Sequence, residues 1–127
     1  MTTNTDPILG LGNDILEIYR IEESLKRFGD RFLQKIFTPK EIAYCKLHSK
    51  SARHFAGRFA AKEAIAKALG CGIGKKLGWH DMEILNHPSG QPYVVFSDKA
   101  KLCFHHPRVL LSISHSKEYA TSVAIRY

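Results

Sequence analysis

The segment from Ala52 to Gly74, which reads ARHFAGRFAAKEAIAKALGCGIG, restricts the fold of this chain more than any other stretch. Ala, Leu, Lys, Arg and Glu are strong helix formers, and no proline interrupts them. Ser49 or Ser51 can cap the start of a helix, and Gly70 suits the left-handed position that ends one. The sequence therefore predicts a long helix around which the other elements are arranged.

A carboxylate interrupts the apolar face of this helix. At about 100° per residue, one face comprises Ala52, Phe55, Ala56, Phe59, Glu63 and Ala66. Burying a carboxylate is costly unless it is paired or holds a metal, so Glu63 is a candidate site residue. The alternative is a surface ion pair between Glu63 and Lys67, worth about 0.2–0.5 kcal/mol, but the flanking phenylalanines argue against it.

Basic residues and glycines accompany Glu63. The basic residues expected around its face are Arg58, Lys62 and Lys67, and the glycines that follow are Gly70, Gly72 and Gly74. This combination suits a phosphate held near a metal-binding carboxylate, beside a turn whose backbone a ligand can approach. The segment is not a P-loop, because the pattern GxxxxGK[ST] is missing from it.

Three motifs resemble those of the 4′-phosphopantetheinyl transferases of the holo-acyl-carrier-protein synthase type. FAGRFAAKEAIAKALGCGIG resembles the core motif of that family, GLGNDILEIYRI its first strand and helix, and SISHSKEYATSVAI its closing hairpin. Order, spacing and length also fit, so the resemblance covers essentially the whole chain. It implies transfer of the 4′-phosphopantetheine arm of coenzyme A to a serine of apo-acyl carrier protein in fatty acid biosynthesis, with release of adenosine 3′,5′-bisphosphate.

The resemblance also implies the catalytic residues. By motif position, Asp14 and Glu63 would hold Mg²⁺, and Lys67 would act as a point charge on the phosphates. This arrangement suits cleavage of a pyrophosphate, whose oxygens need their charge neutralised. Glu63, a metal-bound water or hydroxide are all compatible as acceptors of the serine proton. Taken alone, Asp14 would be a helix cap rather than a ligand.

Coenzyme A is a substrate, and the resemblance implies which residues bind it. The residues matching the nucleotide-binding positions are Arg58, Lys62, His115 and Ser116, with Lys50 as a weaker match, and those matching the pantetheine path are Gly70, Gly72 and Gly74. Short members of the family form homotrimers with sites between subunits. A chain of 127 residues buries only part of its surface, so Asp14 and Glu63 could come from different chains.

The charge of the chain is positive and uneven. The formal net charge is +7, and the region from Ile15 to Lys62 holds 11 Lys and Arg against 5 Asp and Glu, which makes +6. Such a field implies an anionic partner: nucleic acid, a phosphorylated cofactor or an acidic protein. Arg20 and Arg27, and Arg31 if the helix continues that far, are expected to project opposite the apolar face of the helix at 17–28. They are predicted to bind the acidic carrier protein, with ordinary solvated surface as the alternative.

Two rival functions are a small basic nucleic-acid-binding protein and an inactive coenzyme A-binding protein. No RNP-like aromatic motif, recognition-helix pattern or zinc module supports the first, and the presence of Asp14, Glu63 and Lys67 argues against the second. We therefore expect neither nucleic acid nor membrane as a partner. The cysteines, three in number, show no CxxC pairing and are expected to be reduced, which together with the N-terminal sequence favours the cytoplasm.

The remaining elements predict an α+β domain. Strands are expected at 7–15, 82–85, 93–96, 110–114 and 119–125, and helices at 17–28, 39–47, 52–70 and 97–103. Thr38 and Glu41 form a capping box, with Pro39 at the first helical position. The expected architecture is a single domain, 1–127, in which a small antiparallel sheet packs on the central helix and residues 1–6 are flexible.

Overall fold

The structure is a computed structural model that describes residues 7–127, so the expected flexibility of residues 1–6 lies outside the described residues. The elements in chain order are β1 (Gly10–Glu17), α1 (Ile18–Phe28), α2 (Asp30–Ile36), α3 (Pro39–Lys46), α4 (Ser51–Ala68), the 3-10 turn η1 (Trp79–Asp81), β2 (Met82–Asn86), β3 (Pro92–Phe96), α5 (Asp98–Cys103), β4 (Val109–His115) and β5 (Tyr119–Arg126). The predicted α+β class is confirmed. Among residues 7–127, no helix is both long and apolar enough to cross a membrane.

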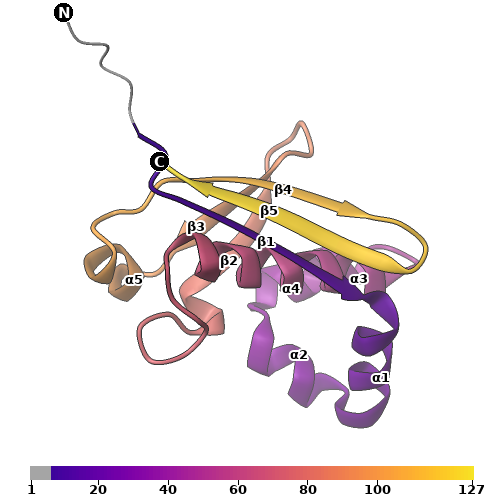
Figure 1. Ribbon diagram of the computed structural model, residues 1–127. Coiled ribbons are helices and arrows are strands. Elements are labelled where there is room, and N and C mark those ends of the chain that lie inside the picture. The colour runs from indigo at the N-terminus through magenta and orange to yellow at the C-terminus, as the bar shows by residue number, and fades with distance from the viewer. Residues whose placement is uncertain (1–6) are drawn as a thin grey trace, which may run out of the picture.

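An antiparallel sheet of three strands, in the order β1-β5-β4, lies along one side of α4. Strands β2 and β3, which correspond to the strands expected at 82–85 and 93–96, form a separate antiparallel hairpin. Figure 1 shows the sheet stretched over α4, with α1 and α2 below one end of it and α5 at the other end. The central helix therefore organises the molecule, because both hydrophobic clusters of the core include its residues.

The ends of α4 test the two capping predictions. At the C-terminal end, Gly70 has φ 77°, and the amides of Gly70 and Cys71 donate to the carbonyls of Lys67 and Ala66 at 3.0 Å each. This pair of bonds is a Schellman motif, so the prediction for Gly70 is confirmed. At the N-terminal end Lys50 occupies the capping position without a side-chain bond, and the prediction of a serine cap is wrong.

The helix that carries Arg20 and Arg27 ends at the predicted residue and does not continue to Arg31. Helix α1 ends at Phe28, because Gly29 adopts φ 53° and redirects the chain into α2. Arg31 therefore lies on α2 rather than on the helix that carries Arg20 and Arg27.

The predicted capping box at α3 is confirmed by the two reciprocal bonds between Thr38 and Glu41.

Glycines let β1 lie unusually close to α4. A Cβ atom added at Gly10 would come within 1.9 Å of the Ala68 carbonyl oxygen, and one at Gly12 within 2.0 Å of the Ala64 carbonyl oxygen. Only glycine allows this approach. Because side chains alternate along a strand, Asp14 shares the inner face with Gly12 and points toward the helix.

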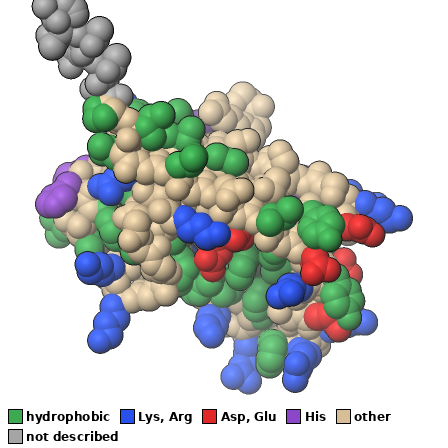
Figure 2. All heavy atoms as spheres, in the orientation of Figure 1, with side chains coloured by type: hydrophobic (Ala, Val, Ile, Leu, Met, Phe, Trp, Pro, Cys, Tyr) green, Lys and Arg blue, Asp and Glu red, His purple; other side chains and the backbone are tan. Residues whose placement is uncertain are grey.

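The outer face of the sheet is apolar and exposed. Leu11 and Ile15 on β1 are 65% and 62% exposed, and Leu110 on β4 is 51% exposed. Figure 2 shows hydrophobic side chains over the sheet, whereas Lys and Arg side chains gather on the opposite side of the molecule, over α1 and α2. Exposed apolar faces of this kind commonly mark contact surfaces.

Candidate active site

The catalytic residues expected from the motifs meet where β1 crosses α4. Lys67 Nζ lies 3.3 Å from Asp14 Oδ1 and donates to the Asn13 carbonyl at 2.9 Å. Glu63 and Lys67 stand on consecutive turns of α4 and therefore share a face. The side chain of Asp14 is 18% exposed and that of Lys67 is 53% exposed, so the group opens to solvent through the lysine.

The electrostatics of this group favour a cation. Burial raises the pKa of Glu63, the neighbouring Asp14 carboxylate raises it further, and Lys67 opposes the shift. Among residues 7–127, no cluster of at least three His, Cys, Asp or Glu side chains could hold a metal ion. A pair of carboxylates nevertheless fits Mg²⁺, which commonly binds through one or two carboxylates and takes its other ligands from water and phosphate oxygens.

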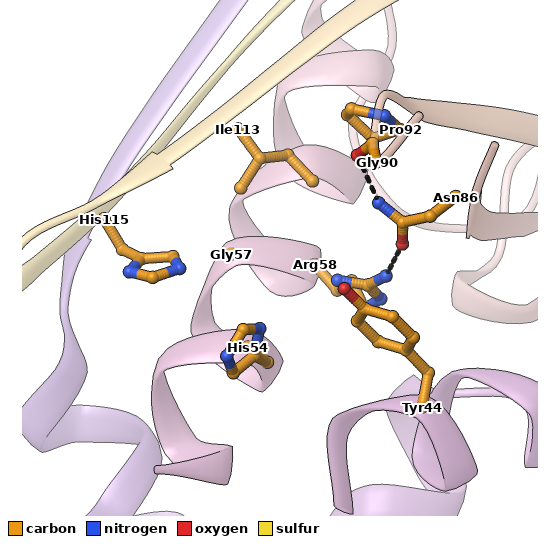
Figure 3. Close-up of a pocket in the computed structure, with 9 residues that line it drawn as sticks. All are labelled: Tyr44, His54, Gly57, Arg58, Asn86, Gly90, Pro92, Ile113 and His115. Carbon is orange, nitrogen blue, oxygen red and sulfur yellow. Dashed lines mark hydrogen bonds between the residues drawn. The ribbon is translucent and has the colours of Figure 1, made fainter. Parts of the chain in front are cut away.

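A second group of residues surrounds a cavity of about 160 Å³ on the other side of α4. The residues that line it are Tyr44 from α3, His54, Gly57 and Arg58 from α4, Asn86, Gly90 and Pro92 from the β2–β3 hairpin, and Ile113 and His115 from β4. Figure 3 shows the Arg58 side chain between Tyr44 and Asn86, and the two imidazoles of His54 and His115 across the cavity from the hairpin.

Within the described part of the chain, Arg58 is a buried cation without a counter-ion. The residue is 4% exposed, its guanidinium carbon lies 4.1 Å from the centre of the Tyr44 ring, and its Nη2 donates to Asn86 Oδ1. Its Nε is buried and has no hydrogen-bond partner, and within the described part of the chain it forms no ion pair. A buried, partly unsatisfied guanidinium lining a cavity suits an anionic ligand.

Histidines form one wall of the cavity. His54 stacks on His48 with ring centres 3.7 Å apart and an interplanar angle of 15°, and it meets His115 edge to face at 5.2 Å. Burial, followed by the nearby His48, His115, Arg58 and Arg53, lowers the pKa of His54 to about 4. His54 is therefore neutral at pH 7, and Arg58 carries the positive charge of this cavity.

The structure contradicts the expectation that Lys62 binds substrate. Its side chain is completely buried, and its Nζ donates to Glu41 Oε1 at 2.7 Å and to the carbonyls of Ile36 and Trp79 at 2.8 and 3.0 Å. These acceptors saturate the three protons of an ammonium group. Burial lowers the pKa of Lys62, and the Glu41 carboxylate opposes that shift. Lys62 is a structural cation that joins α4 to α2, α3 and η1.

The expected grouping of Arg58 and Lys62 around Glu63 is also wrong. Five residues along a helix turn through about 500°, which leaves Arg58 about 140° from Glu63. Asp14 and Glu63 lie beside β1, whereas His115 and Arg58 lie beside β4, and β5 separates those two strands. One chain therefore presents the carboxylates and the cavity at opposite edges of its main sheet.

The other residues expected to bind coenzyme A lie at the two ends of α4. Gly70, Gly72 and Gly74 follow its C-terminal end, and among residues 7–127 no atom beyond the adjacent residues lies within 4 Å of a Cβ added at any of them. Lys50 caps the N-terminal end, in a hollow that Arg53 and Lys117 also line. Ser116 stabilises the β4–β5 turn, where its Oγ accepts from the amide of Tyr119 at 3.2 Å.

Several residues of the cavity were not identified from the sequence: Tyr44, His54, Gly57, Asn86, Gly90, Pro92 and Ile113. A helical signal existed for His54, which precedes Arg58 by four residues and therefore shares its face. Gly57 was detectable only in three dimensions, because an added Cβ would lie 2.8 Å from Ile113 Cγ2 across to β4. Asn86 depends on the hairpin folding back against α4.

Comparison with known proteins shows the family of this chain. Residues 10–124 match the 4′-phosphopantetheinyl transferase superfamily, and the chain belongs to it. Among its curated relatives, the holo-[acyl-carrier-protein] synthase of Chlamydia trachomatis serovar L2 is 52% identical over 118 residues, covering 93% of this chain and 98% of the relative. The synthase of Protochlamydia amoebophila is 50% identical over 117 residues, covering 92% and 96%.

Solved structures of the same kind share the fold. The structure of Helicobacter pylori holo-[acyl-carrier-protein] synthase in complex with coenzyme A matches with a TM-score of 0.85 and 39% identity, over 92% of this chain and 99% of that one. The Neisseria meningitidis synthase matches with a TM-score of 0.89 and 31% identity, over 95% and 99%. The expected phosphopantetheinyl transferase fold is confirmed.

Proposed function

We propose that this protein transfers the 4′-phosphopantetheine group of coenzyme A to a serine of apo-acyl carrier protein, and so acts as a holo-acyl-carrier-protein synthase in fatty acid biosynthesis. The products are holo-acyl carrier protein and adenosine 3′,5′-bisphosphate. The observation that carries the proposal is the meeting of Asp14, Glu63 and Lys67 at the crossing of β1 and α4. The cavity beside Arg58 and the 50–52% identity to named synthases support it.

Asp14 and Glu63 are the proposed ligands of Mg²⁺. The Asp14 carboxylate lies close enough to Glu63 to raise the cost of a charge on it, and Lys67 opposes that effect. When bound, the ion supplies neutralisation of charge on the pyrophosphate oxygens. The two carboxylates would hold the ion beside α4, where Glu63 is also one of the groups that could accept the proton of the carrier serine.

Lys67 is the proposed electrostatic stabiliser of the leaving group. Its ammonium is half-exposed and already lies beside the carboxylates, so it can contact a phosphate oxygen of a ligand bound there without a rearrangement of the chain. A fixed cation at this point stabilises the negative charge that develops as the phosphoanhydride bond breaks. Because the charge grows during the reaction, this contact is stronger in the transition state than in the bound substrate.

The cavity beside Arg58 is the proposed site for the nucleotide end of coenzyme A. Arg58 supplies an unpaired cation, and His115 supplies a polar wall opposite the hairpin. Lys50 and Ser116 are proposed to contact the same end of the ligand, and Gly70, Gly72 and Gly74 the pantetheine arm, whose passage their open surroundings allow. The cavity volume of about 160 Å³ lies below the ~300–1,000 Å³ of typical ligand pockets. This chain alone thus encloses only part of coenzyme A.

We also propose a homotrimer with active sites between subunits. Two observations support subunit assembly: the apolar outer face of the sheet, where Leu11 and Ile15 are more than half exposed, and the separation of the carboxylates from the cavity. A second copy is the proposed occupant of that face. Covering it would remove apolar surface from water and would bring the carboxylates of one chain toward the cavity of the next.

Arg20, Arg27 and Arg31 are proposed to dock the acidic carrier protein. Arg20 and Arg27 lie on α1, and Arg31 lies on α2 beside a hollow that Phe28 and Phe32 also line. Phe28 is 51% exposed, so this face offers an apolar contact among its cations. Several exposed charges acting together steer encounter and orientation even though each pair is weak.

The reaction is proposed for the cytoplasm, where free cysteines such as Cys45 stay reduced.

The direct test is incubation with coenzyme A, Mg²⁺ and apo-acyl carrier protein, followed by mass spectrometry of the carrier. We expect the carrier to gain the mass of one phosphopantetheine group, and a carrier whose acceptor serine is replaced by alanine to gain none. An unmodified carrier, with correctly folded protein and carrier, would refute the proposed activity. Binding to DNA that is stronger than binding to the carrier would favour a nucleic-acid function instead.

A further inference from the structure

Arg58 cannot hold its orientation by itself. Its side chain extends from α4 into a cavity, and no carboxylate within residues 7–127 forms an ion pair with it. A guanidinium recognises an anion through a planar set of donors, so the direction of the plane decides which donors a ligand meets. Neighbouring neutral groups must therefore fix the plane.

Two neutral side chains from different elements fix the plane of the guanidinium. The ring of Tyr44, on α3, lies against the guanidinium at 4.1 Å and fixes the tilt of its plane. Asn86, at the end of β2, accepts a hydrogen bond from Nη2 and fixes the rotation within the plane. Figure 3 shows Arg58 held between these two side chains. Nε is left buried without a partner.

The orientation of the Asn86 amide is itself determined. Its Nδ2 donates to the Gly90 carbonyl oxygen at 2.8 Å. A carbonyl oxygen can only accept, so the amide nitrogen must face Gly90 and the amide oxygen must face Arg58. Gly90 has φ 94°, a backbone conformation that favours glycine and shapes the turn between β2 and β3. One amide therefore connects the hairpin turn to the arginine.

We propose that Asn86 is a positioning residue for coenzyme A binding: it joins the β2–β3 turn to Arg58 and orients the guanidinium toward the phosphate groups at the nucleotide end. This inference rests on the proposed function, because the anion in question belongs to coenzyme A. Asn86 acts through Arg58, and its effect depends on the presence of the guanidinium.

The test is a double-mutant cycle on the full chain, with adenosine 3′,5′-bisphosphate as the probe and isothermal titration calorimetry as the measurement. We expect Asn86→Leu to raise the Kd roughly tenfold, the scale of one hydrogen bond to a charged group. In the Arg58→Lys background, where the planar fork is gone, Asn86→Leu should change the Kd less than twofold. Gln91→Ala, an exposed change in the same turn, is the matched control and should leave the Kd unchanged.

Kinetics separate this role from a merely structural one. With saturating carrier protein, Asn86→Leu should raise the KM for coenzyme A and leave kcat unchanged, since the guanidinium contact is made equally in the bound substrate and the transition state. Its melting temperature is measured alongside. If Asn86→Leu does not fold, Asn86→Ser, which is too short to bridge Arg58 and Gly90, takes its place in the cycle.

The outcomes distinguish the inference from the function on which it rests. If the wild-type protein binds the bisphosphate and Asn86→Leu binds it with the same Kd, the positioning role is overturned and the function stands. The same follows if the effects of the Asn86 and Arg58 substitutions on the Kd simply add. An equal loss of affinity for adenosine, which has no phosphate, would mean that Asn86 contacts the nucleoside directly and would also overturn it. A wild-type protein that binds neither coenzyme A nor the bisphosphate would overturn both.

Discussion

Glu63 is the residue on which the proposed chemistry depends most. Glu63→Gln keeps the shape of the side chain and removes one of the two charges available to Mg²⁺. We expect kcat for phosphopantetheine transfer to fall by roughly 10²-fold or more, with loss of Mg²⁺ binding measured by calorimetry. The variant should melt at or above the wild-type temperature, because the cost of burying the Glu63 charge and its repulsion from Asp14 both disappear.

Glu118→Gln is the matched control for this prediction, since Glu118 is exposed in the β4–β5 turn and should tolerate the change. Asp14→Asn should behave like Glu63→Gln. Undiminished transfer by the wild-type protein in excess chelator would contradict the assignment of both carboxylates as metal ligands.

His54 makes stability depend on pH. Its pKa is lowered from 6.5 to about 4 in the folded protein, chiefly by burial. Between those two values the unfolded chain binds a proton that the folded chain does not, so the free energy of unfolding falls as the pH drops through this window. Above pH 6.5 the histidine is neutral in both states and contributes no slope.

NMR titration of the His54 ring protons should give a midpoint near pH 4, and His54→Phe should reduce the loss of stability between pH 7 and 5 in urea titrations. His87→Phe changes an exposed histidine of the β2–β3 turn and should not alter that loss. A His54 midpoint near 6.5 would show that burial and the neighbouring His48, His115 and arginines do not lower its pKa.

At the scale of elements, the packing of β1 on α4 positions Asp14. Gly12→Ala would push a methyl group into the Ala64 carbonyl, where an added Cβ lies 2.0 Å away. Because the obstacle is backbone, the strand must move, and overpacking of this kind typically costs about 1–3 kcal/mol. We expect a lower midpoint of urea unfolding together with reduced Mg²⁺ affinity, as Asp14 lies two residues along the same strand.

Gly72→Ala provides the comparison, because within residues 7–127 its added Cβ meets no atom within 4 Å beyond the adjacent residues. The stability of this variant should stay close to that of the wild type. Equal stability and equal metal affinity for the two alanine variants would mean that the close strand–helix contact does not hold Asp14 in place.

Local sequence signals predicted most of the elements, because their causes are local. The Thr38–Glu41 capping box and the Gly70 helix end depend on residues within a few positions of one another, and both are confirmed. The end of α1 at Phe28 is confirmed, whereas α2 was not predicted, since the seven residues after Gly29 are too short a segment to show a helical period. The first strand was expected at 7–15 and is observed at Gly10–Glu17, because local sequence signals mark the ends of elements only weakly.

The candidate site was harder to predict where it depends on contacts between distant segments. Lys62 reads as a phosphate ligand beside Glu63, yet its partner Glu41 lies 21 residues earlier and meets it only in the folded core. Asn86 likewise reaches Arg58 only because the hairpin packs against α4. By contrast, the meeting of Asp14, Glu63 and Lys67 followed from motifs, and the structure brings these three together.

At the scale of the whole molecule, the separation of the carboxylates from the cavity gives a direct test of shared sites. If each active site takes its carboxylates from one subunit and its nucleotide cavity from the next, Asp14→Asn disables one half-site and Arg58→Ala the other. Homotrimers of either variant should transfer poorly. Mixed trimers should contain some sites with both intact halves.

We therefore expect the two variants, unfolded together, refolded and assayed for carrier modification, to regain activity that neither shows alone. Random mixing of equal amounts leaves about a quarter of the sites with wild-type residues in both halves. Mixing without unfolding, which exchanges no subunits if the trimer is stable, is the control. Light scattering gives the mass of the assembly in the same samples. If the assembly is a trimer and refolded mixtures stay as inactive as their parents, each site must be built within one chain, and the two edges of the sheet must serve different ligands.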